Sequence, residues 1–398
     1  MKNISFASGP AIVITAAFIG PGSLTICAIA GVDFGYELLW AVLLSCLITI
    51  FFQNTIANLS FKTGKGLVEL LNDKLKNSVF RYLVISFVLI SIFFGNAAYE
   101  AGNITGAYIG LENLIKLSSL QYKEISTSVL LLIITTIIMI IVWRDNNRLI
   151  KNILGVTVLM MSISFLIASI LTKPDIYIIL DSFLTPRWRP ESWKTIVAVL
   201  GTTVVPYNLF LHAALVKKDR NSLNISYLRR DTFIAVAFGG IISSSIIIAA
   251  AGSNINEIQS INDLGNSLSK LYGSNSSILI SIGLFCAGLS SAITAPIAAG
   301  YVVEESFKNF KYKNIFKKIA IYIVVFTGLV FAKSGYQPIE LIRIAQIANG
   351  LLLPLITLFV SILCLPKKND FLILKIRFLF IIILFILFTF LAFKVLFL

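Results

Sequence analysis

Two short interruptions within apolar stretches are the places where this chain could hold a polar ligand. The first is Gly20-Pro21-Gly22-Ser23, and the second is Gly201-Thr202-Thr203-Val204-Val205-Pro206. Glycine and proline break a helix, and backbone released from helical bonding survives in hydrocarbon only where it is buried in protein or faces water. Transporters place such breaks at their substrate sites. The two breaks therefore predict one site near mid-membrane, where bare peptide groups and neutral side-chain oxygens hold the cargo.

Two titratable side chains within apolar stretches are candidates for balancing a charge or carrying a proton. Asn96, Glu100 and Asn103 are spaced so that they share one face of a helix. An intramembrane carboxylate suggests function by default, either as a counter-charge to a cation or as a proton carrier. The alternative is a structural glutamate that the two asparagines hold. His212 is the only histidine, and it is either a proton relay or a structural residue.

Composition places these residues in an integral membrane protein. Of the 398 residues, 57% are hydrophobic and 13% are charged, and the mean hydropathy is +0.90. Soluble domains carry about 25% charged residues, and a compact core of this size cannot hide so much apolar surface. The net charge is +14, but the basic residues lie between apolar runs. That distribution argues against nucleic acid and leaves the lipid bilayer and a transported species as partners.

Eleven apolar stretches are long enough to cross a membrane, which takes about 20 residues. They lie near residues 9–33 (broken), 38–60, 79–111, 126–143, 149–171, 193–216 (broken), 232–252, 276–305, 318–333, 338–365 and 371–395. No polar stretch is long enough for a soluble domain, so residues 1–398 are predicted to form a single transmembrane domain. Lys and Arg are enriched in the loops after even-numbered spans. This bias predicts a cytoplasmic N-terminus and a C-terminus outside.

The residues around both breaks resemble the NRAMP family (natural resistance-associated macrophage proteins) of divalent-metal transporters. That family has Asp-Pro-Gly-Asn in the first span and Met-Pro-His-Asn-Leu-Tyr-Leu-His in the sixth. This chain has Gly20-Pro21-Gly22-Ser23 and, in the sixth span, the run from Val205 to His212. Further segments match in the expected order: Thr63-Gly64-Lys65, Tyr227 to Asp231, Gly283-Leu284, Ser290 to Thr294, and Gln346 before Pro354.

The resemblance implies an all-α membrane protein of the LeuT type with about eleven transmembrane helices. Residues 1–171 and 193–365 would be five-helix repeats of inverted topology, with spans 1 and 6 broken, and residues 371–398 would add a helix. It also implies a set of functional residues. The substrate site would comprise Gly20, Pro21, Gly22, Ser23, Thr202, Thr203, Val205, Tyr207, Gln346 and Asn349. The proton route would comprise Glu100, Asn103 and His212.

Several of these positions depart from the family's pattern. The metal-ligating aspartate falls at Gly20, the asparagine at Ser23, the methionine at Val205 and the histidine after the proline at Tyr207. A third-span Asp-x-x-Glu pair linked to proton movement falls at Glu100-x-x-Asn103. The family's tenth-span glutamine is kept as Gln346, and the last histidine of the sixth-span motif is kept as His212.

These replacements change which cargo the site suits. A dehydrated divalent ion in a low dielectric needs anionic or strongly dipolar ligands, and loss of the thioether removes the preference for softer metals. Neutral oxygens remain, and Ser23, Thr202 and Gln346 are the candidate metal contacts. They suit an ion that keeps several waters, as Mg²⁺ does, or an uncharged polar solute. The loss of three titratable groups predicts weak or absent proton coupling.

The leading hypothesis is a secondary-active or facilitative transporter in the cell membrane that moves a divalent cation by alternating access. A Mg-like hard ion is favoured over manganese or iron. The alternative keeps the fold and changes the cargo to a small organic solute or another ion. An enzyme is not expected, because the sequence has no His/Glu metal motif, nucleophile elbow or cofactor fingerprint. No cofactor is expected, and the oligomeric state is left open.

Overall fold

The structure, a computed structural model, describes residues 10–75, 79–117, 126–144, 146–253, 255, 258, 263, 274–334, 338–366 and 372–397. Every regular element in these ranges is helical. The helices are α1 (Pro10–Phe18), α2 (Pro21–Phe34), α3 (Leu39–Thr63), α4 (Leu67–Lys74), α5 (Val79–Leu117), α6 (Thr127–Trp143), α7 (Asn147–Leu171), α8 (Ile176–Leu184), η1 (Pro190–Ser192), α9 (Trp193–Thr203), α10 (Pro206–Asp219), η2 (Arg220–Ser222), α11 (Ile225–Ala251), α13 (Ser274–Ser306), α14 (Lys313–Lys333), α15 (Pro338–Leu363) and α16 (Leu372–Phe397).

The predicted spans correspond to these helices. Within the described ranges, eight helical segments are long and apolar enough to cross a membrane, and the bent pair α1–α2 makes a ninth. Two shorter apolar helices, α6 and the segment Asn349–Leu363 of α15, lie within the other two predicted spans. The prediction of an all-α integral membrane protein is therefore confirmed.

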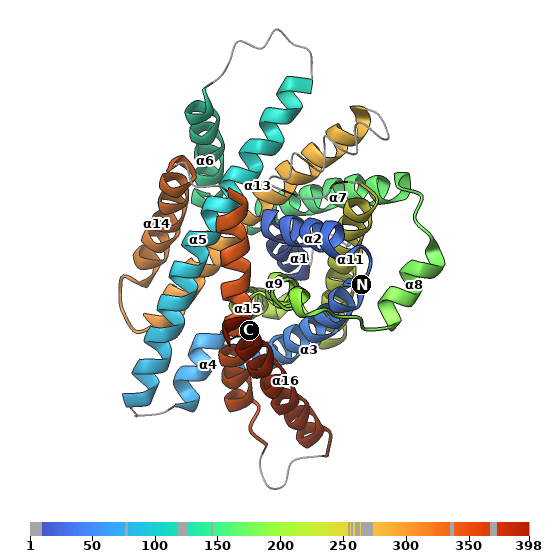
Figure 1. Cartoon of the computed structure of the whole chain (residues 1–398). Coiled ribbons are helices and arrows are strands. Elements are labelled where there is room, and N and C mark those ends of the chain that lie inside the picture. The colour runs from blue at the N-terminus through green and yellow to red at the C-terminus, as the bar shows by residue number, and fades with distance from the viewer. Residues whose placement is uncertain are drawn as a thin grey trace.

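The broken helices lie at the centre of the bundle. Figure 1 shows α1, α2 and α9 surrounded by longer helices, with α5, α6 and α14 on one side and α7 and α8 on the other. The most apolar window of the α9–α10 segment is completely buried, whereas only 22% of the corresponding window is buried in α5 and in α16. This difference in burial is what a bilayer requires. Interrupted backbone must be shielded from lipid, whereas intact helices need no such cover.

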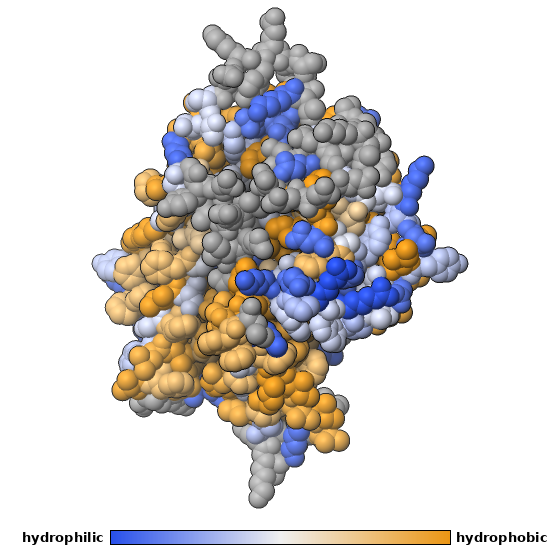
Figure 2. Space-filling model, viewed as in Figure 1, coloured by the Kyte–Doolittle hydropathy of each residue, from blue (hydrophilic) through white to orange (hydrophobic). Residues whose placement is uncertain are grey.

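Apolar side chains on the outer helices face outward. Leu47 on α3, Ile140 on α6 and Phe326 on α14 are each more than half exposed. Figure 2 shows hydrophobic residues over much of the lower left of the visible surface, whereas hydrophilic residues gather towards its right. Exposed apolar faces of this kind are ordinary where the surrounding solvent is lipid.

Both predicted breaks are present. α1 ends at Phe18, α2 begins at Pro21, and the two helices bend by 56°. Gly20 between them is extended, with φ −105° and ψ −176°. In the sixth span the helix stops at Thr203 and restarts at Pro206. Each second half begins with proline, whose fixed φ suits the first turn of a helix and whose missing N–H costs nothing there.

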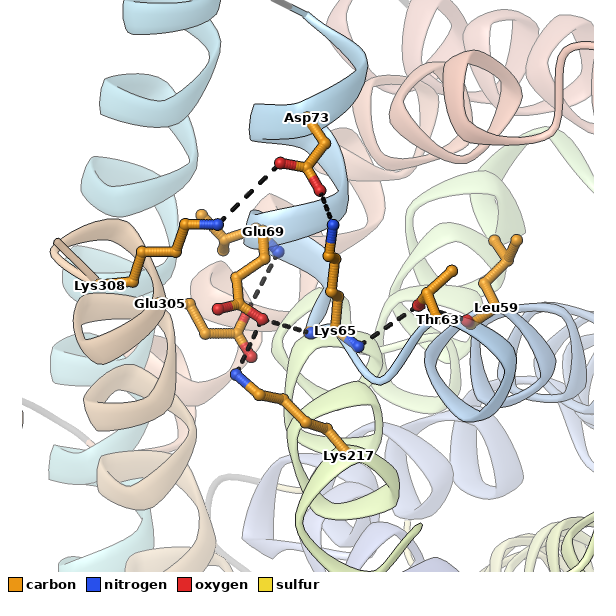
Figure 3. Close-up of polar contacts among 10 residues, drawn as sticks. Leu59, Thr63, Lys65, Glu69, Asp73, Lys217, Glu305 and Lys308 are labelled. Atoms are coloured by element: carbon orange, nitrogen blue, oxygen red, sulfur yellow. Dashed lines mark hydrogen bonds and ion pairs between the residues drawn. The ribbon is translucent and has the colours of Figure 1, made fainter.

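A polar cluster at one end of the bundle fixes α4 against α10 and α13, as Figure 3 shows. The Glu69 carboxylate accepts from Gly66 N–H at 3.0 Å and from Lys217 Nζ at 2.8 Å. The Glu305 carboxylate on α13 accepts from Val68 N–H at 3.1 Å. These bonds satisfy first-turn N–H groups of α4, which have no partner within the helix. The loop after the second span is thereby connected to the second half of the sixth.

Candidate functional site

The two breaks meet through a pair of hydroxyl groups. Ser23 Oγ in the first turn of α2 lies 2.5 Å from Thr202 Oγ1 near the end of α9. Both side chains are almost fully buried. The Ser23 hydroxyl also contacts the carbonyl oxygen of Phe18, the last residue of α1. The site thus brings together two hydroxyls and one carbonyl, which are neutral oxygen donors from three helical ends.

Side-chain hydroxyls also approach the other carbonyl groups at the end of α1. The last four carbonyls of any helix lack partners within it. Tyr207 on α10 donates to the Ala17 carbonyl at 2.8 Å. Ser290 and Ser291 on α13 lie 3.3 Å from the Ala16 carbonyl oxygen. The unwound end of α1 is therefore stabilised by polar groups from α2, α10 and α13, which explains how an interrupted helix can exist in a buried position.

Gln346 and Asn349 on α15 reach the same region through a residue that sequence reasoning missed. Tyr99 on α5 donates its hydroxyl to Gln346 Oε1 and accepts from Asn349 Nδ2 at 2.5 Å. Its ring meets the ring of Tyr207 edge to face, with centroids 5.9 Å apart. Tyr99 lies three residues after Asn96 and four before Asn103, so a polar helical face through those positions was a signal that could have identified it.

Glycine residues, which have no side chain, let the helices approach one another closely at the breaks. A Cβ on Gly22 would overlap the Gln346 amide, and one on Gly201 would overlap the Gln346 carbonyl oxygen and Gly350. The side chain of Gln346 therefore lies against the first turn of α2, one residue from Ser23. A Cβ on Gly20 would overlap the Ser291 hydroxyl. The space that an aspartate would enter at residue 20 is thus occupied by Ser291.

The remaining predicted substrate-site residues differ in where they point. Thr203 Oγ1 bonds to the Val199 carbonyl of its own helix at 3.0 Å, so its hydroxyl is turned away from Ser23. Val205 caps α10 and is buried among apolar residues. Pro21 packs where Gly106 of α5 leaves room for its ring. Of the candidate metal contacts, Ser23 and Thr202 touch directly, and Gln346 lies beside them.

Glu100 is completely buried between α14 and the polar groups that reach the first break. Its side chain lies against Gly328 of α14, where an added Cβ would overlap it. Asn103 Nδ2 is 3.4 Å from Glu100 Oε2, whereas Asn96 donates to the Ala295 carbonyl at 2.9 Å. Only one of the two asparagines therefore holds the glutamate, and Glu100 Oε1 has no hydrogen-bond partner among the described residues. Asn103 extends towards Gly20 and connects the two regions.

His212 lies on α10, away from the hydroxyl pair. Its Nδ1 is 2.7 Å from Gln53 Oε1 on α3, so the ring donates this proton to the amide. Within the part of the chain that the structure describes, its Nε2 is buried without a hydrogen-bond partner, and so are both amide atoms of Asn208 on the same helix. Asn208 belongs to the sixth-span motif but was not selected from the sequence as a candidate.

The donors gathered at the breaks are all uncharged. In the described part of the chain, no three His, Cys, Asp or Glu side chains lie close enough together to hold a metal ion. A ligand in this region would therefore contact hydroxyl, amide and carbonyl groups. Such donors are hard and neutral, and they suit hard cations or polar solutes better than soft metals.

Comparison with known proteins identifies the family. The model for "Natural resistance-associated macrophage protein-like" proteins matches residues 11–398. The chain belongs to the Nramp family. Among this family's curated members, the divalent metal cation transporter MntH of Deinococcus radiodurans is 25% identical over 350 residues, which are 85% of this chain and 77% of that protein.

Solved structures support the Nramp fold. The Eremococcus coleocola manganese transporter, in complex with an aromatic bis-isothiourea substituted compound, superposes with a TM-score of 0.75. The match covers 98% of this Nramp chain and 86% of that one at 17% identity. MhsT in complex with L-phenylalanine gives a TM-score of 0.65 at 13% identity, over 96% of this chain and 98% of that one. The expected LeuT-type arrangement is confirmed.

Proposed function

We propose that this Nramp protein is a transporter that moves a divalent cation across the cell membrane by alternating access, with the two broken helices as its substrate site. The observation that carries the proposal is the contact between Ser23 and Thr202, which joins the two breaks through neutral oxygens. Relatives such as the Deinococcus radiodurans protein are named divalent metal cation transporters. The N-terminus would be cytoplasmic and the C-terminus outside.

The donor chemistry favours a hard ion that retains part of its water shell. Mg²⁺ gives up water reluctantly and binds through a few oxygen ligands and several waters. Ser23 and Thr202, together with the carbonyls at the end of α1, offer oxygens without charge, while Gln346 turns its amide nitrogen towards α2 and its Oε1 towards Tyr99. Gly20 and Val205 supply neither a carboxylate nor a thioether, so selection for manganese or iron over magnesium has no basis in these ligands.

Transport is expected to be weakly coupled to protons. Asn103, Gly20 and Tyr207 stand where the family has a glutamate, an aspartate and a histidine. The Glu100 carboxylate bonds to Asn103, and His212 bonds to Gln53. Among the described residues, the hydrogen bonds of Glu100 and His212 lead to Asn103 and Gln53 and not to the Ser23–Thr202 pair, which favours a cargo site without a direct proton path.

Uptake into proteoliposomes tests this function. Purified protein is reconstituted, and Mg²⁺, Mn²⁺ and Ca²⁺ influx is measured together with internal pH. We expect Mg²⁺ influx at a rate at least equal to that of Mn²⁺, without matching acidification. No flux of any of the three ions would refute the proposal, and a strong preference for Mn²⁺ would refute its selectivity.

A small organic solute is the second candidate. The edge-to-face pair Tyr99–Tyr207 beside the neutral donors favours it, because aromatic rings contact the apolar part of a solute while hydroxyls bind its polar part. Thermal unfolding in the presence of divalent ions, amino acids and organic cations separates the two candidates, since a bound ligand stabilises by mass action.

A further inference from the structure

A cavity of about 520 Å³ opens at the end of the bundle that the lysine bias predicts to be cytoplasmic. It lies between α6, α10, α13 and α14, outside the substrate site. Its lining contains four lysines and two glutamates: Lys217, Lys218, Lys317, Lys318, Glu304 and Glu305. We propose that this cavity binds a phosphate group, carried either by an anionic phospholipid headgroup or by a soluble phosphate ester.

The lysines converge on aromatic rings. Lys317 Nζ lies 4.2 Å above the centre of the Tyr301 ring, and Lys218 Nζ lies 3.5 Å from the Tyr301 hydroxyl. Lys318 Nζ is 5.3 Å from the centre of the Trp143 ring. Lysines that only determine topology would extend into water. Here they are gathered around one concave space, where a phosphate could accept from several ammonium groups at once.

The carboxylates of the lining do not neutralise this charge. Glu304 lies 3.3 Å from Lys317. Glu305 accepts from Val68 N–H of α4, and Lys217 is bonded to Glu69 of α4, which is not a lining residue (Figure 3). The described lining thus carries four ammonium groups and two carboxylates. A bound phosphate would correct that imbalance.

The surroundings of the cavity fit a lipid. Trp143 and Tyr322 stack at its edge with ring centroids 5.8 Å apart, and Trp143 is 63% exposed. Trp143 is the last residue of α6, and Trp and Tyr are enriched at membrane interfaces. Ile140 on α6 and Ile319 on α14 are close in sequence to this aromatic pair. Their apolar side chains are exposed and would contact lipid acyl chains. Basic pockets between helices on the cytoplasmic side bind acidic headgroups elsewhere.

The test compares three probes by thermal unfolding of the full chain in neutral detergent. These are dioctanoyl phosphatidylglycerol, dioctanoyl phosphatidylcholine and glycerol 3-phosphate. We expect phosphatidylglycerol to raise the unfolding temperature more than phosphatidylcholine at equal concentration. Equal stabilisation by glycerol 3-phosphate would support the proposal with a soluble ester as the source. No preference of phosphatidylglycerol or glycerol 3-phosphate over phosphatidylcholine would overturn it.

Matched variants locate the binding. The double variant Lys317→Gln with Lys318→Gln should lower the affinity for the phosphate-bearing probe about 10- to 30-fold. The double variant Lys317→Arg with Lys318→Arg should retain binding, because it keeps both positive charges. Lys311→Gln with Lys313→Gln removes the same charge from residues outside the lining and should leave the affinity within about twofold. An equal loss of affinity in this control would mean that the probe is attracted by the general positive charge of the protein surface, and it would overturn the proposal. The result does not depend on which cargo the protein transports.

Discussion

Ser23 Oγ and Thr202 Oγ1 lie 2.5 Å apart although 179 positions separate them in the chain. They come from the first turn of one half-helix and the last turn of another. This contact is the point where the first and sixth spans join, and it places polar oxygens inside an otherwise apolar bundle.

Removing this hydroxyl pair should impair transport. Ser23→Ala and Thr202→Val each delete a donor that would face the cargo, and each should lower the initial rate of uptake into proteoliposomes about 10-fold, as loss of one ligand contact costs about 1–1.5 kcal/mol. Thr203→Val is the matched control, because its hydroxyl bonds to the Val199 carbonyl. Equal loss in the control would show that the pair has no special role.

Adding a carboxylate at residue 20 should increase affinity for manganese. Gly20 has a backbone conformation that any residue can adopt, but the Ser291 hydroxyl occupies the space that a side chain at residue 20 would need. Gly20→Asp with Ser291→Ala should therefore bind Mn²⁺ at least about 10-fold more tightly, since the anion offsets the buried charge of the ion. Gly20→Asn with Ser291→Ala is the neutral control. Isothermal titration calorimetry measures both, and a gain in the asparagine variant would contradict the charge argument.

Loss of the Tyr99 hydroxyl should destabilise the protein. Tyr99→Phe removes a buried hydrogen-bond partner of the side-chain oxygen Oε1 of Gln346 and of the side-chain nitrogen Nδ2 of Asn349. This loss costs about 1–3 kcal/mol of folding stability. Thermal unfolding should show a lower midpoint, and the affinity for the cargo should fall as well. Tyr312→Phe alters an exposed ring and should leave both unchanged. An unaltered midpoint for Tyr99→Phe would argue against the bridge.

Neutralising Glu100 should leave substrate flux largely intact. The stem of its side chain packs against Gly328 of α14 and its carboxylate lies beside Asn103, so Glu100→Gln removes a charge that is not part of the Ser23–Thr202 pair. Uptake by this variant should stay within about twofold of the original chain, without proton movement in either protein. Acidification that accompanies uptake and disappears in Glu100→Gln would identify Glu100 as a proton carrier instead.

The polar cluster around α4 should matter more than a solvent-exposed ion pair near it. Glu69 is mostly buried and accepts from both Gly66 N–H and Lys217. Glu69→Gln should lower the midpoint of thermal unfolding, because it removes the negative partner of Lys217. Lys65 and Asp73 are both 40% or more exposed, so Lys65→Gln should change the midpoint little. Equal effects would mean that α4 does not hold α10 in place.

Much of the fold could be predicted from the sequence because its causes are local. The length of each apolar run sets the span, and Pro21 and Pro206 mark where each second half-helix begins. The departures at Gly20 and Val205 were equally visible. Where the sequence was insufficient, the reason was packing between helices. The spacing of Asn96, Glu100 and Asn103 predicted one shared face, but their contacts are with different elements: Asn96 with α13, Glu100 with α14, and Asn103 with Glu100 and the first break.

The amino-acid sequence by itself determined the membrane setting, the two breaks and the absence of charged ligands beside them, because hydrocarbon penalises each polar or helix-breaking residue wherever it occurs. Only the tertiary structure decided that Ser23 meets Thr202, that Tyr99 joins Gln346 to Asn349, and that the stem of Glu100 packs against Gly328 of α14. These contacts depend on the rotation and depth of whole helices. Small residues such as Gly22, Gly201 and Gly328 set that packing, and it cannot be read from any one segment.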